Sequence, residues 1–411
     1  MSIIRFGADR LMHGTFAILA PVFALMVAQP AAAASYGSYA ETAGQAAVGA
    51  TFDNAAAAPS GDRAAMLASI DQLPTAADRA DALGQLSPRA YAVLPRLAIT
   101  SMDSYDQEIR DYLAERRSIA ADAPAGVPTH GDRTFNMMLS GGLKQASFDA
   151  APDRPAANMD GRSVRFAVDV RPVDNLIIGA TLGVDNLDAS LDLAQHPRIT
   201  LLTTYIGPYA SFNNGKFYLD VTAGYNLAEY KLRRQVQWAG FDDKLSGSLV
   251  EGDGWAATGE AGAMIRTGGL RIQPFAGLQY RYADMAGFSE AGGPAALDVA
   301  PFNTKSLRSS VGMRLSANMA AGKWTLRPTV EGRWQHELRK RTDSRIEARA
   351  ATRDLEIFTL QPAGFARDVA EVGAGLTATY NHRTSVRLSY HGEYASDRHV
   401  NAARLTISRR F

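Results

Sequence analysis

The sequence predicts an all-β fold, a transmembrane antiparallel β-barrel of about 12 strands preceded by a short α-helical segment. Two observations carry this prediction. Apolar and polar side chains alternate with a period of two over much of residues 133–411, and the connections between the alternating segments are by turns long and short. No stretch beyond the N-terminus offers twenty consecutive apolar residues, which excludes a membrane protein built of helices.

The first 34 residues have the order of a secretory signal peptide. Basic residues come first, a mostly apolar run follows at 15–28, and residues 31–34 are all small, as a signal peptidase requires. A short membrane anchor is the alternative, but the apolar run is only about fourteen residues long and contains Pro21. We therefore predict a signal peptide over 1–34 and export of the chain.

The next segment changes from low complexity to helix signals. Residues 35–58 are rich in Ala, Gly, Ser and Thr and predict a flexible tail or a vestigial passenger. Helix signals follow over 59–125, which we interpret as a helical linker that contains a pore helix. Thr75 stands three residues before an aspartate, near the spacing of a capping box, and Ser87 precedes a proline as an N-cap precedes the first helical position.

The last helix of this segment has the composition of a pore plug. It is expected over 102–117, after a bend or break at Pro95 and before the Pro- and Gly-rich segment 120–132. At 1.5 Å per residue, about sixteen to twenty helical residues span roughly 24–30 Å, enough to cross a barrel. We hypothesise that residues 101–120 plug the lumen; a periplasmic stalk outside the barrel is the alternative.

The barrel itself is expected over 130–411. Within it Phe217, Leu219 and Val221 alternate with Tyr218 and Asp220, so that one face of the strand is apolar and the other polar. The expected strands are longer than most strands of globular proteins, which suits tilted strands that cross a bilayer. Their approximate spans are 133–148, 162–172, 175–190, 197–213, 215–233, 251–267, 270–284, 303–318, 322–337, 368–381, 384–395 and 401–411.

The connections between these strands alternate in length, as the two rims of an outer-membrane barrel do. A β-sandwich has no reason to alternate in this way. The short connections include 173–174, 214, 268–269 and 382–383. The long connections fall near 149–161, 234–250, 285–302 and 338–367.

Two tryptophans mark the expected height of the membrane. Trp324 and Trp334 share one face of a strand, and ten residues span about 33 Å along it. At a tilt of about 40° the vertical rise is roughly 25 Å, the height of the lipid-facing band. We predict that both are membrane-interface aromatics. Pro208, Pro274 and Pro328 fit the barrel less well, because each removes a backbone donor inside an expected strand, so bulges or register shifts are expected there.

The polar face of the strands predicts a wet lumen lined by ionic side chains that pair with one another and with the polar helix. The expected pore-lining residues are Arg165, Arg171, Arg271, Arg281, Arg308, Arg314, Arg327, Arg333, Glu331 and Glu371, with Asp169 and Asp220 as further carboxylates.

The sequence carries few signals of chemistry. The formal net charge is +1, which gives no reason to expect nucleic-acid binding, and there is no cysteine for a disulfide or thiolate site. Seven histidines lack metal-ligand spacing, so no metal, cofactor or catalytic site is predicted. Asp242 and Asp243 are interpreted as a solvated acidic loop rather than a protease site. His391 lacks the Ser-Asn pair that follows the histidine of outer-membrane phospholipases.

Several segments resemble the autotransporter β-domain family. The resemblance extends over about residues 70–411 and is spread over many weak positions. The segments are Tyr-Ile-Gly-Pro-Tyr at 205–209, Gly-Lys-Phe-Tyr-Leu-Asp at 215–220, Gly-Tyr at 224–225, Gly-Ala-Gly-Leu at 373–376, Ser-Tyr-His-Gly-Glu-Tyr at 389–394, a last strand that ends in Phe411, and Ala-Leu-Gly-Gln-Leu-Ser-Pro at 82–88.

The resemblance implies a type V secretion translocator in the bacterial outer membrane: a twelve-stranded barrel, not an enzyme, with a helix through its pore and a short N-terminal passenger. It implies that Phe411, Ile407 and Leu405 form the signal read by the barrel assembly machinery, although Arg409 stands where an apolar residue is usual. Outer-membrane lipid, lipopolysaccharide and periplasmic chaperones are the other expected partners, and the barrel is expected to be monomeric.

Two other readings remain open from the sequence. The barrel is alternatively an outer-membrane pore or an adhesin-like protein that acts through its long loops. The Arg-rich connection 338–367 is then a contact for lipopolysaccharide or a partner, unless it is simply a solvated flexible loop. A soluble secreted β-protein is the third reading.

Overall fold

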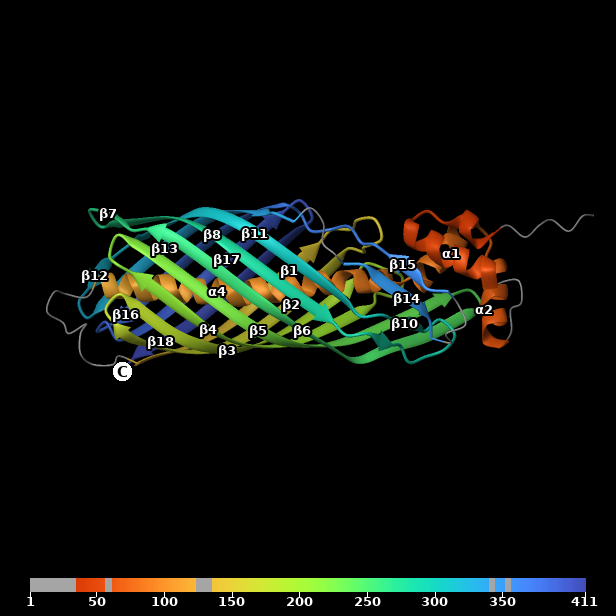
Figure 1. Ribbon diagram of the computed structural model, residues 1–411, viewed down its shortest axis with the longest axis horizontal. Coiled ribbons are helices and arrows are strands. Elements are labelled where there is room, and N and C mark those ends of the chain that lie inside the picture. Colours follow the sequence, from red (N-terminus) through yellow and green to blue (C-terminus); the bar gives the residue numbers. More distant parts are fainter. Residues whose placement is uncertain (1–34, 56–60, 123–134, 340–343, 352–355) are drawn as a thin grey trace, which may run out of the picture. The chain divides into compact units, whose positions relative to one another are not determined.

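The alternating segments close into an antiparallel β-barrel in the computed structural model of this protein, which describes residues 35–55, 61–122, 135–339, 344–351 and 356–411 (Figure 1). The predicted signal peptide and most of the predicted breaker at 120–132 lie outside these residues. The twelve barrel strands are β1 (Phe135–Phe148), β2 (Ala157–Val173), β3 (Leu176–Leu191), β4 (Arg198–Asn213), β5 (Phe217–Trp238), β6 (Phe241–Ala263), β8 (Leu270–Met285), β11 (Phe302–Ala317), β13 (Trp324–Glu337), β16 (Asp368–Tyr380), β17 (Thr384–Ala395) and β18 (Arg398–Arg410).

Each of these strands pairs with its neighbour in sequence, and the last strand closes the ring on the first. The register of β1 with β18 runs from Asn136 opposite Arg410 to Phe148 opposite Arg398. Closure leaves no open edge, so the backbone donors and acceptors of the wall are satisfied within the sheet, as a hydrocarbon surrounding requires. The predicted barrel of twelve strands is confirmed.

One predicted connection was wrong. The segment 234–250 is not a loop: β5 and β6 continue as a hairpin that turns between Trp238 and Phe241. The alternation persists through it, because Val236 and Leu245 are buried while their neighbours face outward. Gly240 sits in the turn with a φ of +83°, a conformation that glycine adopts without steric cost.

The three strand prolines do not shift the register. Each lies where the pairing to one neighbouring strand is interrupted. Pro208 pairs with β3 but has no partner residue on β5, Pro274 lies opposite the break between β6 and the short β7 (Ile265–Thr267), and Pro328 lies opposite the break between β11 and the short β12 (Met319–Ala321). The missing donor therefore falls at a gap in the ladder.

The N-terminal part of the described chain is helical. Its elements are η1 (Tyr36–Tyr39), α1 (Ala43–Ala55), α2 (Gly61–Asp71), α3 (Ala76–Leu86), η2 (Pro88–Val93) and α4 (Leu94–Asp122). The capping box at Thr75 and Asp78 is present, and Pro88 begins η2. The prediction of a flexible tail over 35–58 was wrong for its described part, 35–55, since Tyr36, Val48 and Phe52 are buried. These alanine-rich turns gain their stability from packing, which composition alone does not reveal.

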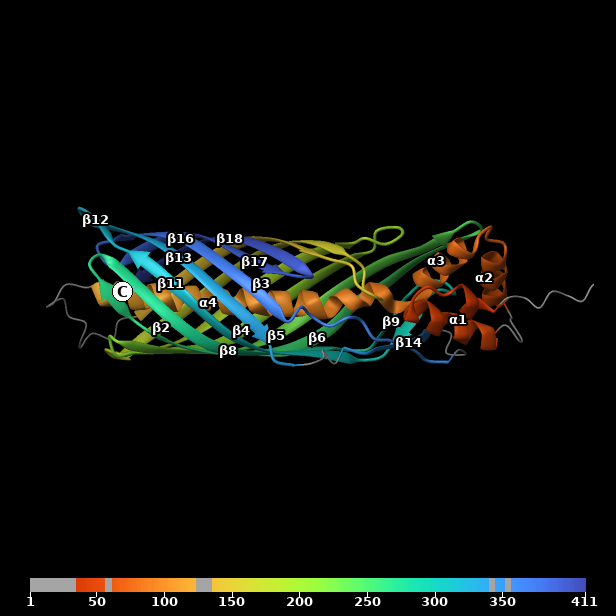
Figure 2. The same cartoon turned by 90° about the horizontal axis from the view of Figure 1, so that it is seen from above.

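The last helix begins earlier than predicted. Pro95 is the second residue of α4, where its missing N–H costs nothing, so the helix runs unbroken from Leu94 rather than resuming at residue 102. Figures 1 and 2 show α4 running lengthwise inside the ring of strands in both views. The predicted pore helix is confirmed.

The two rims of the barrel differ as predicted. Short turns join β2 to β3, β4 to β5, β6 to β8 and β16 to β17, and most of the opposite connections are long. The turns from β5 to β6 and from β17 to β18 depart from this pattern, since only two residues separate the strands in each pair. We call the rim with the long connections the mouth.

The long connections at the mouth are themselves folded. A second sheet contains β9 (Phe288–Ser289), β10 (Leu297–Val299), β14 (Ile346–Ala350) and β15 (Phe358–Leu360). The prediction that 338–367 is a solvated flexible loop was therefore wrong for its described part. Arg349, one of the basic residues of this segment, pairs with Asp298 of β10 at 3.1 Å and so stabilises the second sheet.

Candidate functional site: the outer wall and the filled lumen

The outer wall of the barrel is apolar. On β5 the outward side chains Phe217, Leu219 and Val221 are 60%, 47% and 48% exposed, whereas the inward Asp220 and Thr222 are buried. Water-exposed surfaces of soluble monomers rarely carry contiguous apolar patches of this extent. Further along β5 the outward residues become charged, beginning with Glu229 and Lys231. The apolar belt therefore ends before β5 does, on the side of the mouth.

Outward aromatic side chains form two bands at the ends of this belt. The first band lies near the short turns, where Trp324 contacts Tyr380 at a ring distance of 5.0 Å. The second lies toward the mouth and includes Trp334, which is 48% exposed. Trp324 is 45% exposed, so the two predicted aromatics stand outward, one in each band. The first band is Phe135, Phe212, Phe217, Trp324, Tyr380 and Phe411, and the second is Trp255, Tyr280, Trp334, Tyr390 and Tyr394.

The inner wall is ionic and the lumen is filled by α4. Near the mouth, Asp103 of α4 accepts hydrogen bonds from Arg281 and Arg308 of the wall, both at 3.1 Å. One turn on, Asp106 lies 3.0 Å from Arg281 and accepts a 2.7 Å hydrogen bond from Thr222. All these wall side chains are buried. The aspartates therefore fix one turn of the helix to β5, β8 and β11.

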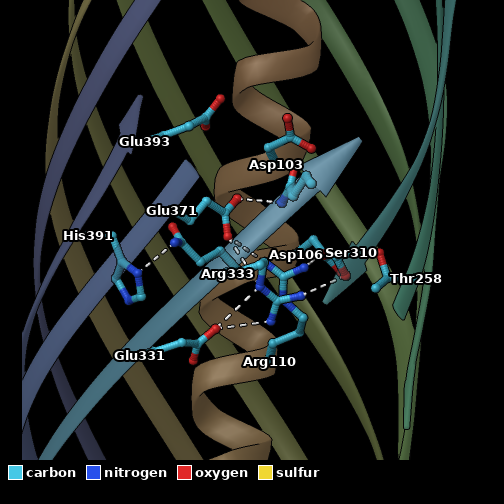
Figure 3. Close-up of polar contacts among 12 residues, drawn as sticks. Asp103, Asp106, Arg110, Thr258, Ser310, Glu331, Arg333, Glu371, His391 and Glu393 are labelled. Atoms are coloured by element: carbon cyan, nitrogen blue, oxygen red, sulfur yellow. Dashed lines mark hydrogen bonds and ion pairs between the residues drawn. The ribbon is translucent and has the colours of Figure 1, made fainter. Parts of the chain in front are cut away.

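Half-way down the helix, a network of charges belongs mainly to the wall. Figure 3 shows Arg333 between Glu331 and Glu371, and Arg110 of α4 beside them. Arg333 lies 2.6 Å from Glu260, 3.1 Å from Glu331 and 3.3 Å from Glu371. Arg110 extends the network from the helix, at 4.0 Å from Glu371. Arg333 thus offsets two buried carboxylates, Glu260 and Glu371, and the partly buried Glu331, which Arg314 also holds at 2.6 Å. Removing Arg333 would take away the nearest cation of Glu260 and Glu371.

Near the short turns the polarity of the contacts reverses, and arginines of α4 meet carboxylates of the wall. Arg116 lies 2.7 Å from Asp169 of β2, and Arg117 pairs with Asp220 of β5. Glu115, at the same level, lies 3.4 Å from Arg387 of the wall. Bonds at both ends of the helix fix its rotation as well as its depth in the lumen.

The predicted pore-lining residues all occupy inward positions. Arg281 and Arg308 bind Asp103, Arg165 lies 3.4 Å from Glu108 and Arg327 lies 3.7 Å from Glu115. Four other predicted members, Arg314, Arg333, Glu331 and Glu371, belong to the central network. The last two lie elsewhere on the inner face, where Arg271 is buried and Arg171 is half-buried.

Sequence reasoning missed several lumen residues. His391 hydrogen-bonds Asp111 at 2.5 Å and Gln107 at 2.6 Å, so it pairs the wall with α4. Asp185 of β3 and Glu260 of β6 bind arginines of the wall. The only sequence signal for these residues was that each occupies an inward position in the alternating pattern of its strand. Their partners lie too far away in sequence to be found from one chain.

The acidic pair Asp242–Asp243 was also interpreted wrongly. The pair lies in β6 rather than in a loop, and only Asp242 is exposed. Asp243 is buried and accepts backbone hydrogen bonds from Gly293 at 2.9 Å and Ala295 at 3.1 Å. Its carboxylate therefore ties the connection between β8 and β11 to the β5–β6 hairpin. The carboxylate is structural because both of its oxygens are engaged in these bonds.

The final strand presents its predicted apolar face outward. Leu405, Ile407 and Phe411 are 50%, 46% and 63% exposed, and the backbone N–H of Phe411 donates to the carbonyl of Phe135 at 2.9 Å. The side chain of Phe411 also meets that of Phe135, at a ring distance of 6.2 Å. The C-terminus is thus fixed at the seam where the barrel closes.

No group of three or more His, Cys, Asp or Glu side chains in the described ranges has the geometry of a metal site. Among the helices of the described chain, none is long and apolar enough to cross a membrane.

The chain thus forms a barrel of twelve strands around a helix that makes ionic contacts along its length. The family model of the autotransporter β-domain matches residues 138–391, more than half of the chain. The chain belongs to the autotransporter β-domain family. It is an outer-membrane translocator barrel, and the barrel domains of this family are transport units.

One solved autotransporter structure supports the same fold. The translocator domain of the autotransporter NalP from Neisseria meningitidis is 16% identical, with a TM-score of 0.54 over 75% of this chain and 98% of that chain. The β-domain of the Bordetella autotransporter Brka is 13% identical, with a TM-score of 0.48 over 68% of this chain and all of that chain.

A curated relative is similar in part. An extracellular serine protease of Serratia marcescens is 23% identical over 209 residues, which are 51% of this chain and 20% of that protein. This autotransporter chain therefore matches about a fifth of the length of that relative. The alternative of an open pore or adhesin-like barrel is not favoured, because the family is one of translocators and the lumen is filled.

Proposed function

We propose that this translocator exports its own N-terminal segment, residues 35–93, and displays it at the cell surface. One observation carries the proposal. The N-terminal end of α4 lies at the mouth, where Arg96 pairs with Asp397 of the β17–β18 turn, and its C-terminal end lies near the short turns, where Arg117 pairs with Asp220. Long connections of outer-membrane barrels face the exterior. A chain that enters the lumen from that side has its preceding residues outside the cell.

The outer wall supports insertion in the outer membrane with lipid and lipopolysaccharide as its surroundings. Trp324 and Trp334 belong to the two aromatic bands that limit the apolar belt, and such bands stand at the membrane–water interfaces of barrels. We assign these residues to the two interfaces. We further propose that periplasmic chaperones carry the unfolded chain and that the barrel assembly machinery reads the face of Leu405, Ile407 and Phe411. The proposed barrel acts as a monomer, because its closed sheet leaves no edge to pair.

The proposal contains no catalytic step. The barrel moves a polypeptide, and its buried charges position α4 rather than a substrate. Protease activity belongs to the Serratia relative and is not transferred to this chain, which matches only a fifth of that relative's length.

Surface labelling tests the proposal. A cysteine at Glu41 or Asp62, both exposed and in a chain without native cysteine, should react with a membrane-impermeant maleimide on intact cells. A cysteine at Gly268, in a short turn, should react only after the outer membrane is permeabilised. Labelling of Gly268→Cys on intact cells while Glu41→Cys stays unlabelled would reverse the orientation and sink the proposal.

A further inference from the structure

The N-terminal helices form many specific contacts with the mouth of the barrel. We call the described part of residues 36–93 the cap. Trp238, at the tip of the β5–β6 hairpin, donates its indole N–H to the Ser69 hydroxyl of α2 at 2.9 Å. The backbone N–H of Gly44, in α1, donates to the Asp153 carboxylate at 3.1 Å. Gln85 of α3 bonds the backbone of Gln237 through both ends of its amide, at 3.1 and 2.9 Å.

A buried charge ties the end of the cap to the connections of the mouth. Arg234 of β5 holds Glu290 with two hydrogen bonds of 2.6 and 2.7 Å. The same guanidinium donates to the carbonyl of Gln85 at 2.6 Å and to that of Ala295 at 3.0 Å. Tyr91 of η2 donates its hydroxyl to Glu290, and burial, followed by the charge of Glu290, raises the pKa of Tyr91 well above its ordinary value. One arginine thus joins three segments that are distant in sequence.

The cap and the mouth also share one hydrophobic core. Val48 and Phe52 of α1, Ile70 of α2 and Leu83 of α3 are buried in it. The barrel supplies side chains from the strand halves nearest the mouth and from the second sheet. These are Phe148, Met159, Leu191, Leu201, Tyr230, Leu232, Val236, Leu245, Val299, Phe302, Ile346, Phe358 and Leu360. An exported cargo that simply departs needs no core in common with the barrel that released it.

We propose that the cap is a permanent seal of this barrel, which remains docked on the mouth even when its covalent link is cut. The inference rests on the proposed export of residues 35–93 and goes beyond it, because it makes the exported segment a part of the barrel rather than cargo. The cap closes the lumen at the mouth, above the closure that α4 provides inside. Its hydrophobic contacts form only after the segment has crossed the membrane, so docking also opposes its return.

Cutting the cap on intact cells tests this inference. A site for a sequence-specific protease is inserted between Pro74 and Thr75, which are exposed and lie between α2 and α3. Protease added outside should cut the chain, and the fragment that contains α1 and α2 should sediment with the membranes and leave them only in urea. Appearance of the fragment in the medium without denaturant would overturn the inference and leave the export proposal intact. Cutting only after cell lysis would overturn the export proposal and the inference together.

A cross-link provides a positional control. The Cβ of Ser69 lies 4.0 Å from the place where a Cβ on Gly240 would stand, within the range of a disulfide. In the cut protein, the Ser69→Cys/Gly240→Cys pair should hold the fragment in urea until a reductant is added. The pair Ser69→Cys/Gly268→Cys is the matched control, because Gly268 also has a positive φ but lies at the opposite rim. Equal cross-linking by both pairs would contradict the docked position.

Weakening one contact gives the energetic test. Trp238→Ala removes the indole that bonds Ser69, and truncating a tryptophan that anchors an interface commonly weakens binding about tenfold or more. The fraction of fragment released from cut membranes should rise by that factor. Trp255→Ala is the matched control, since this tryptophan is 56% exposed on the outer wall and should leave release unchanged. If Trp238→Ala releases no more fragment than Trp255→Ala, this contact does not hold the cap on the mouth, and the inference is contradicted.

Discussion

Removing the Asp106 carboxylate should loosen the helix that fills the lumen. Asp106 lies 3.0 Å from Arg281, 2.9 Å from Arg110 and 2.7 Å from Thr222, and it is 1% exposed. Breaking a buried ion pair by removing one partner costs roughly 3–5 kcal/mol. Asp103 still neutralises Arg281, so the lower end, about 3 kcal/mol, applies to Asp106→Ala. At 1.4 kcal/mol per factor of ten, the population with a displaced helix rises about a hundredfold.

Single-channel recording in planar bilayers measures this population in a chain that lacks the cap, because such a barrel conducts ions only while α4 is displaced. In this background, Asp106→Ala should open about a hundred times more often than the parent with Asp106 in place. Asp160→Ala is the matched control: Asp160 is an exposed carboxylate on the outer face of β2, and its loss should not alter opening. If Asp106→Ala forms a heat-modifiable, folded barrel and opens no more often than the control, the reasoning about these buried contacts is refuted. Deleting residues 101–120 from the same chain without the cap should give permanently conducting barrels.

Three further outcomes follow from the structure. Trp324→Ala and Trp334→Ala should each lower the urea midpoint in lipid vesicles by removing an interface anchor, and an unchanged midpoint for both would contradict their assignment. Removing Phe411 should slow assembly in cells, seen as unfolded precursor in the periplasm, and normal assembly would exclude it from the signal. Burial opposes the charge of Asp397, but the hydrogen bond from Arg96 and the charge of Arg96 outweigh burial and lower the pKa of Asp397. The stabilisation from this ion pair should therefore be complete above about pH 4 and fade below it. Thermal stability measured against pH, compared with that of an Arg96→Met variant, checks this outcome.

The barrel could be predicted from the sequence because its signal is local and repeated. A strand such as β5 shows its lipid face at every second residue, and a one-residue slip would reverse both faces, so the pattern fixes the register as well as the strand. The same rule placed Arg165 and Arg281 on the inner face without knowledge of their partners. The polar composition and length of α4 were enough to propose that it fills the lumen.

The elements at the mouth could not be predicted in this way because tertiary contacts create them. The hairpin at 234–250 carries too few apolar residues to stand out until Val236 and Leu245 meet the cap. Helix α1 has little intrinsic amphipathic character and folds where Phe52 finds a shared core. The bond from His391 to Asp111 joins residues 280 positions apart, so no local pattern indicates it.

The direction in which β5 turns its two faces tests the account most directly. In the cysteine-free chain, a spin label is attached in turn at Leu219, Asp220, Val221 and Thr222, and its collision rate with oxygen in lipid vesicles is compared with that of a water-soluble nickel complex. Labels at Leu219 and Val221 should collide mainly with oxygen, which dissolves in lipid, and labels at Asp220 and Thr222 should be shielded from it. Equal oxygen exposure at all four positions, or greater exposure at Asp220 and Thr222, would contradict a barrel with an apolar exterior and an ionic interior.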